Sequence, residues 1–571
     1  MRRTKEKKQP TMLLAMLLAM VMTLSFLPIS AFAAEGEAVT NGLVSETGGA
    51  NDFRLAGNAA ATLWMDADES APVRRVAEDF KADVNRVTGL TPVISNAAER
   101  PQGAAVIFGT LDDSGMIKDL IESGKITQDE VTAIEGQWEA YLIKVIDAET
   151  LVVAGADPRG AVFGLYEISE QMGVSPWYYF ADVAVNQKES VYIPAGTSLT
   201  DMPDVAYRGI FLNDEEKLSR WASNVMGDPN TMGPETYGKI FELILRLKGN
   251  YIWAAMHVNS FNNIQGNIDL IQEYGVVLGS SHCDMLLRTN VHEWDNWKAR
   301  ADIREKFGTN IQYDYTVSKD AVLEYWRENV IRHKDTEAQW TLGMRGAHDE
   351  PFNTANINQP AYASYGADEA TRKANLLNEI IREQQDILLK ELGQEKYDKS
   401  FQAMIPYKEV LPIYNHPAFD LPENVAVIWC DDNHSIMRRM PDEVERVREG
   451  GHGIYYHVSY WAPADQSYMW LSSAPLSLIG SELDKSWENN IRRAWVLNVG
   501  DIKPQETEMS FFIRYGWDVE EYKNNADKFV EDFMGNQFGD EYAEEIADIQ
   551  TAFYKHTNVR KLDHMRVNLF D

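Results

Sequence analysis

Short apolar runs alternate with amphipathic stretches through the middle of the chain, from Tyr207 to Val499. The runs are continuous and rich in aromatic and β-branched residues, which is typical of strands covered on both faces. In the stretches between them, apolar residues recur every three to four positions, which indicates helices packed along one side. The predicted strands are 207–213, 250–256, 276–282, 338–344, 400–406, 424–430, 453–459 and 493–499.

Eight strands that alternate with helices predict a (β/α)8 barrel of the TIM type. An open doubly wound sheet is the alternative, but no G-x-G-x-x-G follows the first strand, which disfavours a dinucleotide-binding version. The predicted helices are 236–249, 320–334, 372–393, 442–451 and 477–490.

Other segments flank the barrel, which we place at 201–518. Strand and helix signals over 52–200 predict a small N-terminal α/β domain, whose last helix begins at an Asp157 cap. Residues 519–571 predict the start of a helical domain, with Tyr542, Ile546, Ile549 and Phe553 on one stripe. We expect the chain to end inside that domain, which would then be cut short.

The first 33 residues have the pattern of a secretory signal peptide. Arg2 and Arg3 precede an apolar stretch that ends in the small-residue site Ala31-Phe32-Ala33. We therefore expect cleavage before Ala34, a linker over 34–51, and a secreted, extracellular protein without membrane contact. A retained membrane anchor is the alternative.

The charge and the cysteine content of the chain limit the kinds of ligand and partner that it can bind. The formal net charge of −33 disfavours nucleic acid and anionic lipid, and an anionic ligand would need a cation placed in its site. With only Cys283 and Cys430, the cysteine count excludes a cysteine-based metal site, and no cofactor is predicted. A homodimer is left open.

Polar side chains gather directly after the predicted strands, where barrel enzymes carry their functional residues. Turns alone also enrich polar residues there, but the combination of carboxylates, imidazoles, amides and aromatics favours a carbohydrate site. These residues are Asp214, His257, His282, Asp284, Arg345, His348, Asp349, Glu350, Lys408, Glu409, Asp431, Asn433, His434, His457, Tyr460, Trp461 and Asn498.

Two of the carboxylates follow neighbouring strands, the fourth and the fifth. Many glycosidases use such a pair, one as general acid and the other as base or nucleophile. Asp349 and Glu409 are our first pair, with Asp214 and Asp431 in reserve. Glu350 joins the catalytic group as a residue that orients Asp349 or pairs with Lys408.

Other chemistries have weaker support. A catalytic metal is disfavoured because no H-E-x-x-H occurs, and a Ser-His-Asp hydrolase because no G-x-S-x-G follows a strand. Cys283 as a nucleophile beside His282 is disfavoured because adjacent residues rarely face each other across a site.

Two cations accompany the acids, Arg345 and Lys408. In so acidic a protein they suit a carboxylate-bearing sugar, which the planar fork of an arginine can bind with two hydrogen bonds. The alternative is that each cation only neutralises its neighbours.

Several motifs together resemble glycoside hydrolase family 115, which comprises xylan α-1,2-glucuronidases. They lie in order between Pro203 and Trp517 and include "YRGIFLNDEE", "LRLKGNYIWAAM", "GMRGAHDEP", "YKEV", "VIWCDDN", "GGHGIYYHVSY" and "WVLNVGDIKPQE". The resemblance implies release of glucuronic acid or its 4-O-methyl ether from glucuronoxylan, with inversion and without metal or organic cofactor.

The resemblance also implies roles for individual residues. Asp349 and Glu409 match the catalytic carboxylates, and we assign Glu409 as general acid and Asp349 as base. Two departures, His434-Ser435 and Trp461, would reshape the pocket beside the uronate. The substrate-binding residues are predicted to be Arg345, Lys408, Asn433, Asn498, His282, His457, Tyr460 and Trp461.

Two functions from outside this family stay open. One is another barrel glycosidase, such as a hexosaminidase-like enzyme, because a small α/β domain precedes the barrel there too. The other is a non-catalytic carbohydrate-binding protein, which would need the aromatic residues and not the acids.

Overall fold

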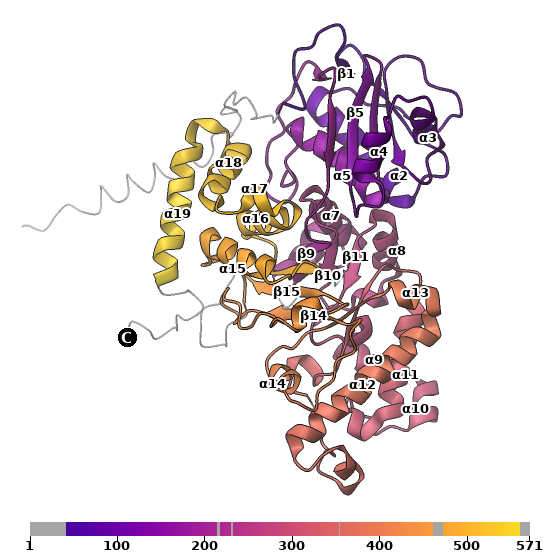
Figure 1. The fold of residues 1–571 in the computed structure, drawn as a ribbon, viewed down its shortest axis with the longest axis vertical. Helices are drawn as coiled ribbons and strands as arrows, with labels where there is room; N and C mark the ends of the chain where they lie inside the picture. Colours follow the sequence, from indigo (N-terminus) through magenta and orange to yellow (C-terminus); the bar gives the residue numbers. More distant parts are fainter. Residues whose placement is uncertain (1–41, 214–216, 230–231, 353, 461–471, 560–571) are drawn as a thin grey trace, which may run out of the picture.

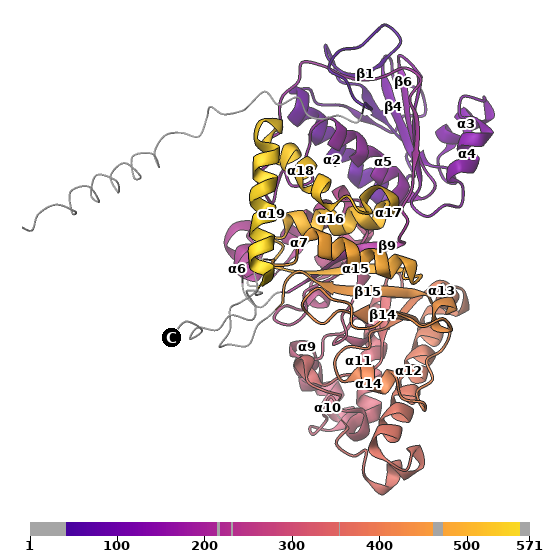
Figure 2. The same cartoon turned by 60° about the vertical axis from the view of Figure 1, so that its left-hand side comes forward.

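Three parts follow one another along the chain in the computed structural model: an N-terminal α/β unit, a barrel of parallel strands and a group of C-terminal helices (Figures 1 and 2). The structure describes residues 42–213, 217–229, 232–352, 354–460 and 472–559. The predicted signal peptide and the part of the linker up to residue 41 therefore lie outside the described residues. Among the described helices, none is at once long and apolar enough to cross a bilayer.

The eight strands of the barrel are all parallel and pair in the order β11-β10-β9-β16-β15-β14-β13-β12. A parallel bridge between Leu278 and Ala338 joins the two ends of this order, so the sheet closes on itself. The predicted TIM-type barrel is thus confirmed, and each strand overlaps its predicted run. The strands are β9 (Tyr207–Leu212), β10 (Tyr251–Trp253), β11 (Val277–Gly279), β12 (Gln339–Leu342), β13 (Phe401–Met404), β14 (Ala426–Cys430), β15 (His452–His457) and β16 (Ala494–Gly500).

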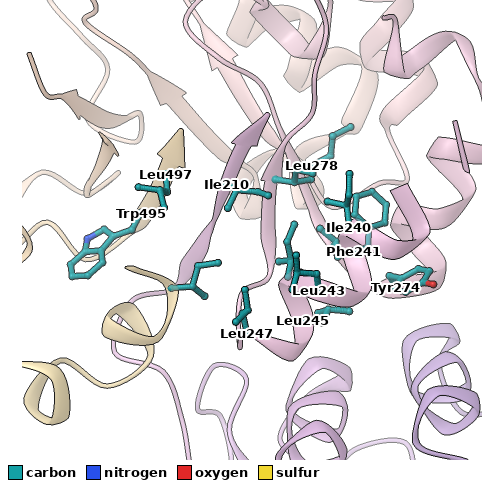
Figure 3. Close-up of a cluster of buried hydrophobic side chains, with 14 of the residues drawn as sticks. Ile210, Ile240, Phe241, Leu243, Leu245, Leu247, Tyr274, Leu278, Trp495 and Leu497 are labelled. Atoms are coloured by element: carbon teal, nitrogen blue, oxygen red, sulfur yellow. The ribbon is translucent and has the colours of Figure 1, made fainter. Parts of the chain in front are cut away.

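The two faces of the strands carry different cores. One cluster, with Phe211, Trp253 and Tyr455 among its members, gathers side chains from seven of the eight strands in the interior of the barrel. The opposite face carries aliphatic residues, and Figure 3 shows Ile240 and Phe241 of α7 (Pro234–Arg246) close to Leu278 of β11. Because both faces are buried, the strands read as continuous apolar runs.

One of the helices predicted around the barrel does not form. The prediction of a helix at 442–451 is wrong, because the described chain there has only a 3-10 turn, Glu445–Val447. Val444 and Val447 are both 82% exposed, and the contacts that hold this segment are polar ones, such as the hydrogen bond from the Tyr414 hydroxyl to Glu445 Oε1 at 3.0 Å. The helices of this part are α6 (Lys217–Trp221), α7, α8 (Gln265–Tyr274), α9 (His292–Ala299), α10 (Ala301–Phe307), α11 (Tyr315–His333), α12 (Glu369–Leu392), α13 (Gln394–Lys399), α14 (Val410–Tyr414), α15 (Leu476–Glu488) and α16 (Glu506–Trp517).

The N-terminal unit is a six-stranded sheet in the order β3-β2-β4-β6-β5-β8, with a separate pair of β1 and β7. Asp157 caps α5 by accepting a hydrogen bond from the Gly160 N–H, which confirms the predicted cap. The elements are β1 (Phe53–Ala56), β2 (Thr62–Trp64), α2 (Ala71–Thr88), β3 (Ile94–Ser95), β4 (Ala105–Thr110), α3 (Gly115–Glu122), α4 (Gln128–Ile134), β5 (Tyr141–Asp147), β6 (Thr150–Gly155), α5 (Pro158–Gln171), β7 (Val191–Ile193) and β8 (Ser198–Asp201).

A buried network of charged and polar side chains connects the N-terminal unit to the barrel. The Glu139 carboxylate accepts hydrogen bonds from Arg159, from Arg208 Nη2 at 2.7 Å and from Asn250 Nδ2 at 2.6 Å. Arg208 and Asn250 lie at the N-terminal ends of β9 and β10. The N-terminal unit therefore covers the end of the barrel opposite to the carboxyl ends of the strands.

The C-terminal helices α17 (Val519–Tyr522), α18 (Ala526–Phe538) and α19 (Ala543–Val559) lie beside both other parts (Figures 1 and 2). The predicted stripe is confirmed for two of its four residues: Ile546 and Phe553 are partly buried and pack against the core, whereas Ile549 is 70% exposed and Tyr542 lies in a preceding turn. The buried residues of the helix are Ala543, Ala547 and Tyr554.

Tyr554 donates a 2.5 Å hydrogen bond to the buried carboxyl group of Glu508 on α16. Burial raises the pKa of Glu508 to about 7, against the lowering effect of that hydrogen bond. Between about pH 4.5 and pH 7 the native protein keeps the proton on Glu508, whereas the unfolded chain releases it. Glu508 therefore lowers the free energy of unfolding least below pH 4.5, and lowers it increasingly as the pH rises to 7.

We expect Glu508→Gln to raise the thermal midpoint at pH 8 and to change it little at pH 5. The difference between the two pH values corresponds to about 3 kcal/mol for a shift of this size. Scanning calorimetry at both values measures it, with the exposed Glu545→Gln as control. Parallel pH profiles for Glu508→Gln and the wild type would contradict the assignment.

Candidate active site

Strained backbone positions lie at the carboxyl ends of β12 and β13. After β12, Gly343 has a φ of 120° and leads to a 3-10 turn in which His348 and Asp349 have φ values of 53° and 62°. After β13, Lys408 has a φ of 46°. Each left-handed non-glycine residue costs about 1–3 kcal/mol and persists where its surroundings fix it, often at functional sites. These turns bring Lys408 to Asp349 and place Asp349 and Glu409 on the same guanidinium, that of Arg345.

Arg345 connects the two predicted catalytic carboxylates. Its guanidinium is 1% exposed and binds Glu409 with two hydrogen bonds, Nε to Oε1 at 2.9 Å and Nη2 to Oε2 at 2.8 Å. Nη1 donates to Asp349 Oδ1, and Nη2 also donates to the Asp349 carbonyl at 3.1 Å. All three nitrogens thus have partners, so the structure favours the neutralising alternative over the predicted uronate clamp for this residue.

Asp349 has two further cationic or polar neighbours. His282 Nε2 lies 3.2 Å from Oδ1, and Lys408 Nζ donates to Oδ2 at 2.6 Å. Burial alone would raise the pKa of Asp349, but hydrogen bonding and positive charge from His282, Arg345 and Lys408 hold that pKa well below its usual range. Asp349 is therefore ionised before any ligand binds.

Glu409 follows β13 and immediately precedes α14. The backbone N–H of Phe352 donates to Glu409 Oε1 at 3.0 Å, in addition to the contacts with Arg345. About a quarter of the side chain, 28%, remains exposed. The carboxylate is thus oriented from two sides while part of it stays open to a ligand.

Aromatic rings link this acid pair to the strands on the far side of the barrel. Tyr407 lies with its ring 4.0 Å from that of His282, and its hydroxyl donates to Asn433 Oδ1 at 3.0 Å. Tyr455 packs against His282 and His457, with ring centroids 5.7 and 4.5 Å apart. Our site prediction omitted both tyrosines. Tyr407 directly follows a strand and could have been found, whereas Tyr455 lies inside one.

Asp431, predicted as a reserve catalytic acid, is buried with both oxygens engaged. His457 Nδ1 lies 2.6 Å from Oδ1, and the backbone N–H groups of Asn433, Ser435 and His457 also donate to the carboxylate. Such a group holds its loop and His457 in place, and although it borders the neighbouring pocket it is only 1% exposed. The prediction of a direct catalytic role is therefore not supported by this geometry.

Asn498, predicted to bind substrate, is likewise engaged within the protein. Its Nδ2 donates to the Tyr455 hydroxyl at 2.9 Å, and its Oδ1 accepts from the Gly500 N–H at 3.1 Å. It therefore fixes Tyr455, which in turn contacts the ring of His457.

Cys283 contacts the acid pair, contrary to the expectation that neighbouring residues do not share a site. Its thiol lies 3.5 Å from Asp349 Oδ1 and 3.8 Å from Arg345 Nη1. The thiol also hydrogen-bonds with the His282 ring, and both side chains are buried in the turn after β11. Burial raises the pKa of Cys283, but the neighbouring His282 lowers it overall.

The remaining predicted residues fall into three groups. Glu350 is exposed, and Lys408 pairs with Asp349, so of the two roles considered for Glu350 the pairing with Lys408 is wrong. Tyr460 lies with its ring 5.7 Å from that of His457 and 6.0 Å from that of His434. Asp214 and Trp461 lie outside the described residues.

A pocket opens next to the acid pair, with Lys408 on its wall. Aromatic, amide and cationic side chains surround it. The residues that line it are Pro406, Tyr407, Lys408, Leu411, Trp429, Cys430, Asp431, Asn433, Arg438 and Arg439. Two oriented carboxylates beside such a pocket form an arrangement suited to acid–base cleavage of a glycosidic bond.

Comparison with known proteins adds independent findings. The sequence model described as glycosyl hydrolase family 115 matches residues 200–564. The solved structure of BtGH115A, described as a family GH115 4-O-methyl-α-glucuronidase with specificity for decorated arabinogalactans, is similar with a TM-score of 0.79 and 31% identity. The match covers 89% of this chain and 63% of that one, so this chain spans less than two thirds of the relative's length.

A second solved structure is similar in fold alone. It is a GH138 enzyme targeting pectin rhamnogalacturonan II, with a TM-score of 0.50, 12% identity, and coverage of 87% of this chain and 69% of that one. No curated protein sequence matches the chain.

Proposed function

Since this chain belongs to glycoside hydrolase family 115, we propose that it hydrolyses the bond between a glucuronic acid, or its 4-O-methyl ether, and the sugar chain that carries it. The observation that carries the proposal is the pair of carboxylates, Asp349 and Glu409, oriented by one buried guanidinium at the carboxyl end of the barrel. We propose that the substrate is glucuronoxylan and that the protein acts on it outside the cell, after cleavage of the signal peptide.

The two acids take different parts in the proposed reaction. Glu409 acts as general acid and protonates the departing glycosidic oxygen. Asp349 accepts a proton from the water that attacks the anomeric carbon from the other side, which inverts the anomeric centre. The contacts that keep Asp349 ionised support its role as the proton acceptor.

Lys408 is the proposed cation for the uronate carboxylate. It is 39% exposed, unlike the buried Arg345, and it lines the pocket together with the exposed Arg438. When Lys408 moves from Asp349 to the uronate, Asp349 loses a cationic partner and becomes a stronger base. Binding of the charged sugar would thus prepare the base that acts on it.

The activity test uses three substrates: glucuronoxylan, a glucuronidated arabinogalactan and an N-acetylhexosaminide. Free uronic acid from either of the first two, lost in Asp349→Asn, is the expected result, and proton NMR of the first-formed anomer tests inversion. Release of N-acetylhexosamine instead would favour the hexosaminidase-like alternative. Binding of glucuronoxylan without any release would favour the carbohydrate-binding alternative.

Lys408→Met should weaken recognition of the uronate. Loss of a charge-assisted hydrogen bond of about 1.5–3 kcal/mol predicts a fall in kcat/KM of roughly 10- to 100-fold, mainly through KM. Steady-state kinetics measure this, with Lys399→Met on the exposed side of α13 as control. An unchanged KM would show that another group holds the uronate.

A further inference from the structure

Within the described ranges, one group of three metal-ligating side chains lies close enough to hold an ion: His282, Cys283 and Asp349. The candidate ligand atoms all lie within 4.8 Å of one another. We propose that these residues form an inhibitory site for a borderline or soft divalent cation such as Zn²⁺. The ligands would be His282 Nε2, Cys283 Sγ and Asp349 Oδ1, a set with a single thiolate, whereas the cysteine count excludes only a site built from several cysteines.

The spacing of the three atoms fits tetrahedral zinc. Bonds of about 2.0–2.3 Å to nitrogen, oxygen and sulfur place neighbouring ligand atoms of a tetrahedron roughly 3.4–3.6 Å apart. Here His282 Nε2 lies 3.2 Å and Cys283 Sγ 3.5 Å from Asp349 Oδ1. The ligand atoms therefore need only small shifts to enclose an ion. His257, whose ring bonds with the Cys283 thiol, or a water would complete the tetrahedron.

The main chain around the two neighbouring ligands is held in place. The Cys283 N–H donates to Ser281 Oγ at 3.3 Å, and Asn290 Nδ2 donates to the Cys283 carbonyl at 3.0 Å. His282 and Cys283 are buried, whereas the Asp349 side chain is 29% exposed. The ion would thus enter past Asp349 and reach a preformed pair of nitrogen and sulfur ligands.

Two cations compete with a metal for Asp349, and both have somewhere to go. Arg345 keeps its two hydrogen bonds to Glu409 when it releases Asp349. Lys408 is exposed enough to turn into solvent. When Zn²⁺ binds, the Cys283 thiol gives its proton to buffer and a sulfur–zinc bond replaces the S–H bond. The thiolate and the carboxylate then balance the charge of the ion, and nothing is oxidised or reduced.

The donor set also predicts selectivity. Thiolate and imidazole favour Zn²⁺, Co²⁺ and Cu²⁺, whereas Mg²⁺ and Ca²⁺ prefer oxygen ligands. A bound ion would occupy the oxygen of Asp349 that faces Arg345 and would block its action as a base. The inhibition rests on the proposed function, but the binding does not.

Cobalt titration of the full chain tests the binding without reference to activity. We expect one equivalent of Co²⁺ to give a thiolate-to-cobalt charge-transfer band that Zn²⁺ abolishes and Mg²⁺ leaves unchanged. Cys283→Ser should lose the band, while Cys430→Ser, which removes the other buried thiol, should retain it. No band in the wild type, or an equal band in Cys283→Ser, would overturn the proposal.

Two further measurements keep the outcome decisive. Circular dichroism establishes that Cys283→Ser is folded, and an anomalous-scattering map from a Zn²⁺-soaked crystal should place the ion between His282 and Cys283. A peak at any other site would count against the proposal. In activity assays we expect Cys283→Ser to tolerate at least tenfold more Zn²⁺ than the wild type. If the chain releases no uronic acid from any substrate, the proposed function fails while the cobalt result still decides the metal site.

Discussion

Glu409→Gln will fold normally and lose about 10²- to 10⁴-fold in kcat on a polysaccharide substrate. Glutamine matches glutamate in shape, but it cannot deliver the proton that the departing sugar oxygen needs, and a general acid typically contributes a factor of this size. Initial rates of uronic acid release measure the loss. Glu395→Gln makes the same chemical change on the exposed surface of α13 and should leave the rate unchanged.

The leaving group separates the roles of the two acids. A nitrophenyl glucuronide departs without much help from an acid, so Glu409→Gln should lose far less activity on it than on the polysaccharide. Asp349→Asn removes the base and should lose similar activity on both substrates. The opposite outcome would be equal losses for Glu409→Gln on both substrates and a much smaller loss for Asp349→Asn on the nitrophenyl glucuronide than on the polysaccharide. Asp349 would then be the acid and Glu409 the base.

Glu139→Gln should destabilise the protein by about 3–5 kcal/mol. Glu139 is the buried carboxylate between Arg159 and Arg208, and breaking a buried ion pair leaves an uncompensated charge in the interior. The amide keeps one acceptor oxygen but no negative charge. Arg159 keeps its pairing with Glu337, but the buried Arg208 loses its carboxylate partner where the N-terminal unit meets the barrel. Scanning calorimetry should show a clearly lower thermal midpoint.

The exposed Glu135→Gln, four residues away in sequence, provides the matched control and should melt with the wild type. Since the network lies at the end of the barrel opposite the acid pair, we expect Glu139→Gln to keep near-normal kcat at low temperature. A wild-type midpoint in Glu139→Gln would mean that hydrogen bonding alone, without the charge, holds the two parts together.

The barrel was predictable because its strands are buried on both faces, which leaves continuous apolar runs such as 493–499 in the sequence. The missing helix at 442–451 was not, because a periodic pattern does not reveal whether a surface exists to cover it. Val444 and Val447 are spaced like helical core residues and nonetheless face solvent.

The acid pair was predictable for a similar reason: parallel neighbouring strands end at the same edge, so residues after β12 and β13 had to meet. The partners of each acid were not. The sequence does not show that Arg345 bends back to bind both carboxylates, or that backbone N–H groups from 433 and 435 occupy Asp431. Such contacts depend on local turns in which Asp349, Lys408 and Asn433 take left-handed conformations.

The contacts of Arg345 with both acids limit which substitutions this site can accept during evolution. One guanidinium satisfies two carboxylates, so replacing either acid leaves the arginine half paired, and replacing the arginine leaves two acids repelling each other. A lysine offers a point charge and not a planar fork, so it could not serve both acids at once. Positions 345, 349 and 409 should therefore be retained or exchanged together in descendants of this gene, whereas the exposed Glu350 is free to drift alone.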